Sequence, residues 1–405
     1  YDAAGVLARE DRGNGTATSY ATDAAGNVTQ ITLLGPGNVV QDNISYVYDA
    51  SRRRVEMTTN AGVTRYRYDV VGQLISTTLP GGRTLTWTYD LNGNRISTTD
   101  NGAPTAYAAN EMNQYTAVGG TPASYDGNGR LISHGATSYA WNSRGQLASM
   151  TAPGEIWSFE YDVFGNRNAA TRNGVRTEYL VDLTRAGDVL VEYTAGGAVI
   201  ARYAHGYGLV GRLATGGNAY YGFDGSGNAI NLTDGSGAVA NTYRYLPFGE
   251  VESATEAIPN PFQFGGREGM MRAGALTYAR ARYQNNGWGR FISEEPAKRM
   301  VLNAYAYAHN NPVTYLDANG YEDAATTQVK NGFFGLGIGQ SVVENGLFAL
   351  DKVNDAAHLG FEGIKGYGIY AGARAQWARL RFDAQAAAWV SREEWHPQQR
   401  GRWLA

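Results

Sequence analysis

A short motif recurs through more than half of this chain: an aromatic residue, an aspartate, two variable residues and a glycine. Copies with this pattern begin at Tyr1, Tyr68, Tyr89, Tyr125, Tyr161 and Phe223, and degenerate copies begin at Thr22, Tyr48 and Trp141. Successive copies are often about 20 residues apart, which is room for two short strands and two turns. The repeat therefore predicts a chain of similar small units, each packed on its neighbours in sequence.

Each unit has the pattern of a β-hairpin. In Thr84–Tyr89, large side chains alternate with threonine, as in a strand that is buried on one face. The aspartate that follows can accept hydrogen bonds from the turn, and the glycine can adopt a positive φ. The next strand begins at once, as in Gln73–Thr77. We expect a continuous antiparallel ribbon with one apolar and one wet face, which can coil around a water-filled space.

Composition supports many short strands and excludes several classes of site. The chain has 53 glycines and 28 tyrosines, and charged residues make up 18%. It has no cysteine, which excludes disulfides, cysteine nucleophiles and thiolate metal sites. The net charge of −3 gives no global attraction to nucleic acid. No apolar run reaches about 18 residues, so we expect no membrane-spanning helix. The chain begins at Tyr1 without a methionine, and we expect a mature or excised fragment.

A second series of motifs follows the repeats. Its members, in order, are Tyr243–Gly249, Asn260–Glu268, Tyr278–Tyr283, Gly289–Ser293, Asn303–Tyr307, Asn310–Val313 and Asp317–Gly320. This series resembles the RHS-associated core, and the repeats resemble the YD repeats of RHS proteins, teneurins and insecticidal toxin-complex C components. The resemblance covers roughly residues 1–320.

The resemblance implies a mainly β fold, in which a spiralling shell of antiparallel YD-repeat hairpins is closed by the core as a plug. It divides the chain into a YD-repeat β-shell (1–242), an RHS-associated core (243–320) and a variable C-terminal region (321–405), which we expect to be a short mixed α/β tail.

The resemblance also implies a function. We expect a structural fragment of an RHS-repeat toxin that encloses and delivers a C-terminal effector, and that is secreted or delivered at the cell surface. The implied partners are its own C-terminal cargo, a secretion or toxin-complex partner and an immunity protein. The alternative is an extracellular adhesion module that binds carbohydrate or protein and encloses no cargo.

Bacterial members of this family often cut themselves just after the core with acidic residues. The matching positions here are Glu295 and Asp317, and the cut would fall between Gly320 and Tyr321. Both positions depart from the family's Asp-Pro pairs, because the first acid is a glutamate and Ala318 replaces the second proline. A misplacement on the order of 1 Å can cost about 10²-fold in rate. We therefore expect aspartyl-type self-cleavage to be weak or absent, and Asp317 to cap a turn with Gly320.

The sequence points to no metal or cofactor site. The histidines are scattered without metal-ligand spacing, and we expect hydrogen-bonded loop or strand residues. The glycine-rich run from Gly332 to Gly339 lacks the Lys-Ser/Thr ending of a phosphate loop.

The last 85 residues have a different pattern. Apolar residues between Val342 and Phe361 recur at three- and four-residue steps, which predicts an amphipathic helix, and a second element is expected from Asp383 to Trp395. Gly366–Tyr370, Ala378–Asp383 and Trp395–Gln399 resemble the C-terminal extension of WYL-domain regulators. A recruited cargo, a fusion and a chance match remain open. The arginines of this tail are compatible with a nucleic-acid target or with a solvated face, and its activity is left open.

Overall fold

The computed structural model describes residues 1–2, 6–184, 187–297, 302–321 and 327–328, and these belong to one compact unit. They form antiparallel β-sheets without an α-helix in the described ranges, and four short 3₁₀ turns. The predicted mainly β fold built from hairpins is confirmed. The elements predicted between Val342 and Trp395 lie outside the described residues.

Twenty-five strands form one long sheet. They are β1 (Arg9–Asp11), β2 (Ala17–Thr22), β3 (Val28–Leu34), β4 (Val40–Tyr48), β5 (Arg54–Thr59), β6 (Gly62–Tyr68), β7 (Leu74–Thr78), β8 (Thr84–Tyr89), β9 (Arg95–Asp100), β10 (Ala103–Ala109), β11 (Tyr115–Val118), β12 (Thr121–Tyr125), β13 (Leu131–His134), β14 (Thr137–Trp141), β15 (Leu147–Ala152), β16 (Glu155–Tyr161), β17 (Arg167–Arg172), β18 (Val175–Asp182), β19 (Asp188–Thr194), β20 (Val199–Gly206), β21 (Gly208–Leu213), β22 (Ala219–Phe223), β23 (Ala229–Asp234), β24 (Val239–Tyr245) and β25 (Val251–Glu256). Each pairs antiparallel with the next in sequence. We call this sheet the strip.

The remaining elements are smaller. A second sheet contains β26 (Met271–Ala273), β27 (Leu276–Ala279), β28 (Arg282–Asn285) and β29 (Arg290–Phe291), and β30 (Tyr315–Leu316) pairs with β31 (Thr327–Gln328). The 3₁₀ turns are η1 (Pro36–Asn38), η2 (Pro80–Gly82), η3 (Gly266–Glu268) and η4 (Ala308–Asn310).

The repeat motif forms the turn at most of the alternate hairpins of the strip. Asp69 Oδ1 accepts hydrogen bonds from the amides of Val71 and Gln73, at 3.0 and 2.9 Å. Gly72 has a φ of 92°, a left-handed conformation that favours glycine. Asp90 makes the same pair of contacts in the next repeat, to the amides of Asn92 and Asn94. The Asp-x-x-Gly turn predicted from the sequence is thus present.

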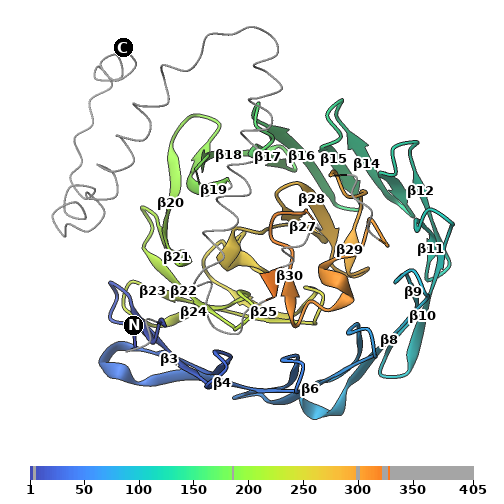
Figure 1. Cartoon of the computed structure of the whole chain (residues 1–405). Helices are drawn as coiled ribbons and strands as arrows, with labels where there is room; N and C mark the ends of the chain where they lie inside the picture. Colours follow the sequence, from blue (N-terminus) through green and yellow to red (C-terminus); the bar gives the residue numbers. More distant parts are fainter. Residues whose placement is uncertain (3–5, 185–186, 298–301, 322–326, 329–405) are drawn as a thin grey trace, which may run out of the picture. The chain divides into compact units, whose positions relative to one another are not determined.

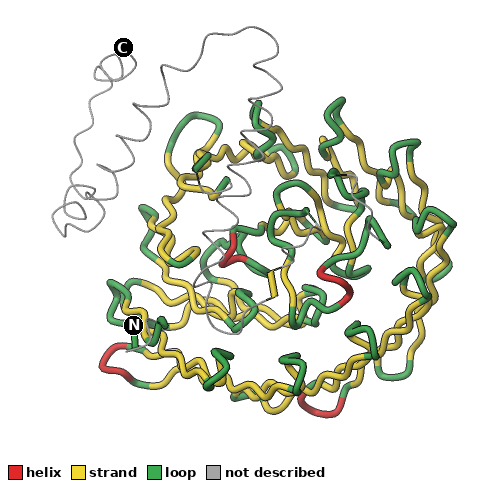
Figure 2. Tube along the Cα trace, viewed as in Figure 1, coloured by secondary structure: helices red, strands yellow, loops and turns green. Residues whose placement is uncertain are grey.

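A β-bulge lies just before the turn in many repeats of the strip. The strand register shifts next to Tyr48, Tyr68, Tyr89, Tyr161 and Tyr245, which marks a β-bulge in each repeat. A bulge bends its strand and increases the local twist. Because the bulge recurs, the bends add, and the strip curves continuously (Figures 1 and 2).

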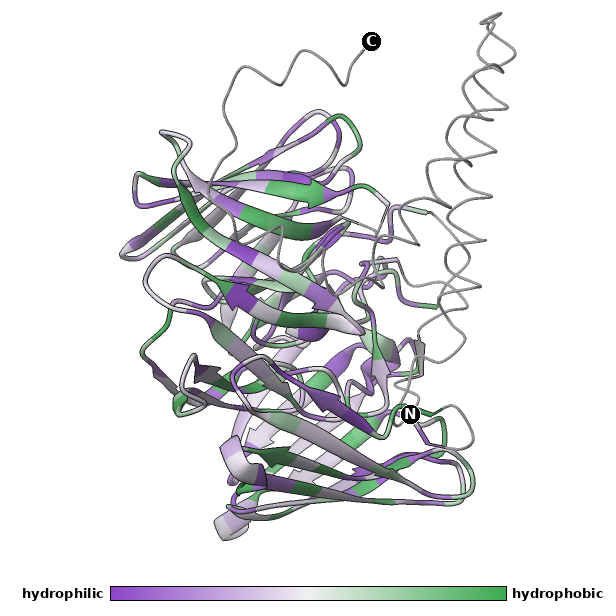
Figure 3. Ribbon diagram, turned by 90° about the vertical axis from the view of Figure 1, so that its left-hand side faces the viewer, coloured by the Kyte–Doolittle hydropathy of each residue, from purple (hydrophilic) through white to green (hydrophobic). Residues whose placement is uncertain are grey.

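The strip alternates in polarity along its strands, as predicted (Figure 3). Trp87 and Leu85 are buried, whereas the neighbouring Thr88 is exposed. The buried side chains face a segment that follows the strip: Phe262, Tyr283 and Ile292 form one apolar cluster with Phe159 and Tyr221. Figure 1 shows this segment, in orange, inside the curve of the strip.

The two ends of the strip overlap. Ile230 of β23 packs on the cluster of Ile31, Ile44 and Tyr46. Polar contacts join the turn between β22 and β23 to β4 and β5. The Tyr46 hydroxyl accepts a hydrogen bond from the Gly225 amide at 2.7 Å, and Arg54 donates one to the Ser226 hydroxyl at 2.8 Å. Strands near the end of the strip therefore pack on strands near its start. We call this contact, of β23 and the β22–β23 turn with β3, β4 and β5, the seam.

Candidate self-cleavage site

The two predicted acidic residues come from different parts of the segment inside the strip. Glu295 follows β29, and Asp317 follows β30, at the start of a turn that ends at Gly320. Each side chain is 1% exposed. Two carboxyl groups this deeply buried require a counter-charge, because a buried charge is costly unless it is paired.

Arg282 supplies that charge. Its Nη2 atom lies 2.8 Å from Glu295 Oε2 and 3.2 Å from Asp317 Oδ2. Its guanidinium is fully buried and stacks over the ring of Phe291, with 3.6 Å between the guanidinium carbon and the ring centre. The two predicted acidic side chains therefore contact the same nitrogen atom of Arg282.

The same arginine binds the peptide bond that was predicted to be cut. Arg282 Nε donates a hydrogen bond to the carbonyl oxygen of Gly320 at 2.5 Å, and Nη1 donates one to the carbonyl of Ala304 at 2.9 Å. A charged donor at a carbonyl oxygen polarises the carbonyl and stabilises negative charge that develops there. The Gly320–Tyr321 bond therefore lies next to both acids and beside a donor able to stabilise an oxyanion.

Asp317 also shapes the turn before this bond. Its Oδ1 accepts a hydrogen bond from the Gly320 amide at 2.8 Å, so the expected turn cap is present. Gly320 has a φ of 72°, and a Cβ atom there would lie 2.4 Å from the carbonyl oxygen of Ala279 and 2.8 Å from the amide of Arg282. Both its conformation and its surroundings require glycine.

Burial raises the pKa of Asp317 to about 6, and the negative charge of Glu295 acts in the same direction. Arg282 and the backbone amides of Gly320 and Tyr321 act against this rise in the pKa. A carboxyl group of this pKa can hold a proton near neutral pH. Paired acids in which one is protonated and the other ionised are the arrangement used for acid–base hydrolysis.

Sequence reasoning did not select Arg282 as a site residue. Arg282 lies within the Tyr278–Tyr283 motif, but no local pattern distinguishes it from Arg280 two residues earlier. It reaches the acids because the β27–β28 hairpin places it beside the turn after β30. This contact joins segments that are distant in sequence.

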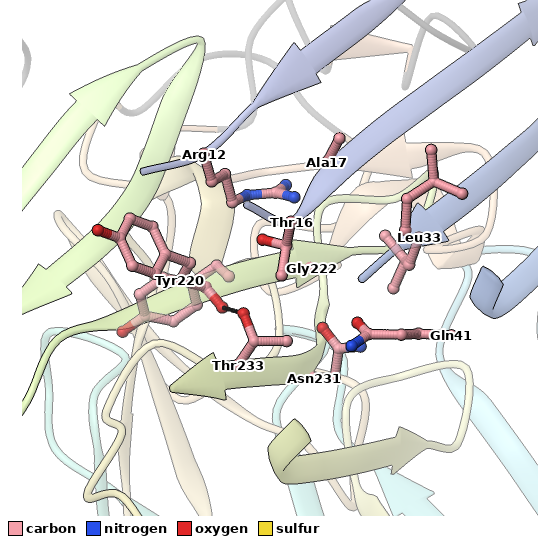
Figure 4. Close-up of a pocket in the computed structure, with 11 residues that line it drawn as sticks. Arg12, Thr16, Ala17, Leu33, Gln41, Tyr220, Gly222, Asn231 and Thr233 are labelled. Atoms are coloured by element: carbon pink, nitrogen blue, oxygen red, sulfur yellow. Dashed lines mark hydrogen bonds between the residues drawn. The ribbon is translucent and has the colours of Figure 1, made fainter. Parts of the chain in front are cut away.

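Other candidate sites in the described ranges are weaker. These residues include no group of three or more His, Asp or Glu side chains placed to hold a metal ion. The part of the chain that the structure describes contains no helix able to cross a bilayer. A small polar pocket lies at the seam, between Arg12 and Thr16 on one side and Tyr220 and Asn231 on the other (Figure 4). It has room for little more than a water molecule.

A strip of chained hairpins wrapped around a core segment, with an acid pair at the end of that segment, defines a YD-repeat shell protein. Residues 37–313 match the model of the family described as Teneurin YD-shell, and the chain belongs to this family.

Comparisons with individual proteins agree. The chain is 31% identical over 274 residues to the tRNA nuclease WapA of Bacillus subtilis strain 168, which covers 63% of this chain and 12% of the relative. It is 32% identical, with the same coverage, to the tRNA3(Ser)-specific nuclease WapA of Bacillus spizizenii. The aligned part of the chain thus corresponds to about an eighth of the length of these relatives.

Solved structures share the fold. The Photorhabdus luminescens Tc holotoxin pore with TccC3 matches with a TM-score of 0.66 and 20% identity, over 81% of this chain and 19% of that chain. A crystal structure of TcdB2-TccC3 matches with a TM-score of 0.64 and 20% identity, over 79% of this chain and 19% of that chain.

Proposed function

We propose that this chain is a structural part of an RHS-repeat toxin, which encloses and delivers a polypeptide that follows the core. In this proposal the strip is one turn of a spiralling shell, the part of residues 243–320 that follows β25 closes it as a plug, and residues 321–405 include the cargo. The observation that carries the proposal is that the strip overlaps itself at the seam while its inner side packs on the following segment, from Phe262 to Val313.

The contacts of the segment after β29 support its role as a plug. The side-chain amides of Asn310 and Asn311 donate hydrogen bonds to the carbonyl oxygens of Gly93 and Gly72, at 2.8 and 2.9 Å. The Tyr305 hydroxyl donates one to the carbonyl of Gly129 at 2.7 Å. All three acceptors are glycines of repeat turns, so the segment binds a feature that recurs along the edge of the strip.

The path of the chain past the candidate cut also supports enclosure. Thr327 and Gln328 form β31, which pairs with β30 beside Asp317. Thr327 and Gln328 therefore lie antiparallel to Tyr315 and Leu316 of the inner segment. We propose that the polypeptide beyond this point is the cargo, and that the partners are a secretion or toxin-complex component and an immunity protein. We further propose a secreted or surface-delivered location.

Limited proteolysis of the full-length natural protein tests enclosure. The cargo proposal expects residues after Gly320 to resist protease until denaturant unfolds the strip, as followed by intact mass. Immediate digestion of these residues, with the preceding residues intact, would instead support an adhesion module that encloses nothing.

We also propose that the site cuts the Gly320–Tyr321 bond slowly. Glu295 accepts a proton from a water molecule, whose oxygen bonds to the Gly320 carbonyl carbon. Arg282 Nε stabilises the resulting oxyanion, and protonated Asp317 donates its proton to the Tyr321 nitrogen as the carbon–nitrogen bond breaks. The products are a carboxylate at Gly320 and an amine at Tyr321. The longer side chain of Glu295 and the loss of proline after Asp317 favour a low rate.

A further inference from the structure

Three consecutive residues, from the β27–β28 turn to the first residue of β28, bind three consecutive carbonyl oxygens before the candidate cut. Arg280 Nη1 donates a hydrogen bond to the carbonyl of Ala318 at 3.2 Å, and the Ala281 amide donates one to that of Asn319 at 3.1 Å. Arg282 Nε completes the series at Gly320. The turn therefore sets the register of the chain that leads to the Gly320–Tyr321 bond.

Arg280 is itself tied to the strip. Its Nη2 atom lies 2.7 Å from Asp188 Oδ1, at the start of β19, and Nη1 also donates a hydrogen bond to the Glu268 carbonyl at 2.8 Å. The side chains of Arg280 and Asp188 are 16% and 17% exposed, so solvent weakens this ion pair less than one at the surface. The planar guanidinium can serve these acceptors together, which a lysine cannot do with the same geometry.

We propose that Arg280, held by Asp188, is a positioning residue for self-cleavage. This inference rests on the proposed cutting of the Gly320–Tyr321 bond. Arg280 touches neither that bond nor the two acids in the contacts described, and it acts by holding the carbonyl of Ala318 so that Gly320 stays against Arg282 and Asp317. A shift on the order of 1 Å at a reacting bond can cost about 10²-fold in rate.

Because Asp188 belongs to the strip, the position of Arg280 at the cleavage site depends on the folding of the strip. Arg280 can be held in this position only after the strip has folded as far as β19. In this proposal, the Gly320–Tyr321 bond is cut only after the strip has folded. A chain whose strip has not folded keeps its C-terminal region attached. Arg280 and Ala281 contact residues 318 and 319 through the backbone carbonyls of these residues.

A time course of cutting in the full chain tests the proposal. The chain is made by cell-free translation with labelled methionine, sampled over time, denatured and analysed for the fragment ending at Gly320. Arg280→Met and Asp188→Asn are expected to slow cutting about 10- to 100-fold. Arg280→Lys, which keeps the charge beside Asp188, is expected to restore part of the rate. Arg83→Met is the control, because it breaks an ion pair of the strip with Asp100 away from this site.

These measurements distinguish a local effect of Arg280 on the cleavage site from unfolding of the strip and from an absence of self-cleavage. Equal rates for the wild type and Arg280→Met would overturn the inference. So would equal losses of cutting rate in Arg280→Met and Arg280→Lys accompanied by protease sensitivity of the strip, since both changes would then act by unfolding.

If the wild type is not cut at all, the proposed cleavage fails, and hydrogen exchange of the Gly320 amide decides the positioning role. Faster exchange in Arg280→Met than in Arg83→Met supports it, and equal exchange overturns it.

Discussion

The Tyr68 hydroxyl, at the end of β6, donates a hydrogen bond to the carbonyl oxygen of Arg54, at the start of the preceding strand β5, at 2.5 Å. Tyr89 makes the equivalent contact with Leu74, and Tyr161 with Leu147. The tyrosine of each repeat thus fastens its own hairpin to the preceding one, close to the bulge that bends the strip. This contact gives a physical reason for tyrosine, rather than phenylalanine, before the aspartate.

Tyr68→Phe is therefore expected to destabilise the protein by about 1 kcal/mol, since it removes the donor and leaves a carbonyl without this partner. Urea unfolding followed by far-ultraviolet circular dichroism measures the change. Leu91→Ala, at a turn residue that is 98% exposed, is the control and should stay within about 0.5 kcal/mol of the wild type. Equal midpoints for Tyr68→Phe and the wild type would contradict the role of the hydroxyl.

Gly320→Ala should abolish cutting and destabilise the turn. The added Cβ would collide with the Ala279 carbonyl, and an alanine at a φ of 72° is strained in addition. Gly154→Ala is a matched control, because Gly154 has a φ of 77° with open space around it. We expect the control to lose about 1 kcal/mol from strain alone and Gly320→Ala to lose more. Equal thermal unfolding temperatures for the two variants would show that the collision is unimportant.

Arg282→Met should be among the most destabilising single changes in this region. It leaves Glu295 and Asp317 buried without their shared cation, and loss of one partner of a buried ion pair costs about 3–5 kcal/mol. Guanidinium unfolding measures this loss. The triple change Arg282→Met, Glu295→Gln and Asp317→Asn removes all three charges and should recover much of the stability. No recovery in the triple variant would argue against electrostatics as the cause.

The contribution of Asp317 to the stability of the fold should decrease as pH rises between about 4 and about 6. The pKa of Asp317 is about 6 in the folded protein and 3.8 in an unperturbed chain, so the folded state binds more protons in this window. The contribution is on the order of 2–3 kcal/mol across the window. Thermal unfolding in a pH series compares the wild type with Asp317→Asn, which should lose this part of the slope. An unchanged slope would assign the pH dependence to other groups.

Self-cleavage should slow by about tenfold per pH unit above pH 6, because only protonated Asp317 can donate to the leaving nitrogen. The labelled time course, repeated in buffers from pH 5 to pH 8, gives the profile. A rate that rises with pH through this range would assign Asp317 the role of base and Glu295 that of acid.

The sequence alone was enough to predict the hairpins, their turns and the order of the strands. The alternation in Thr84–Tyr89 and the Asp-x-x-Gly turn at Asp90 are local signals, because strand period and turn conformation depend on neighbouring residues. The acid pair could also be selected from the sequence, through its motif positions. The bulge at each aromatic residue was not predicted, since it depends on the partner strand.

The tertiary structure decided three further features. It determined that β23 packs on β3 and β4 at the seam, that Arg282 joins Glu295 to Asp317, and that Arg280 ties the turn after β30 to Asp188 of the strip. These contacts join residues from different repeats or different segments. Their formation depends on how many small bends accumulate along the strip, and a sum of bends over many hairpins is not encoded in any one of them.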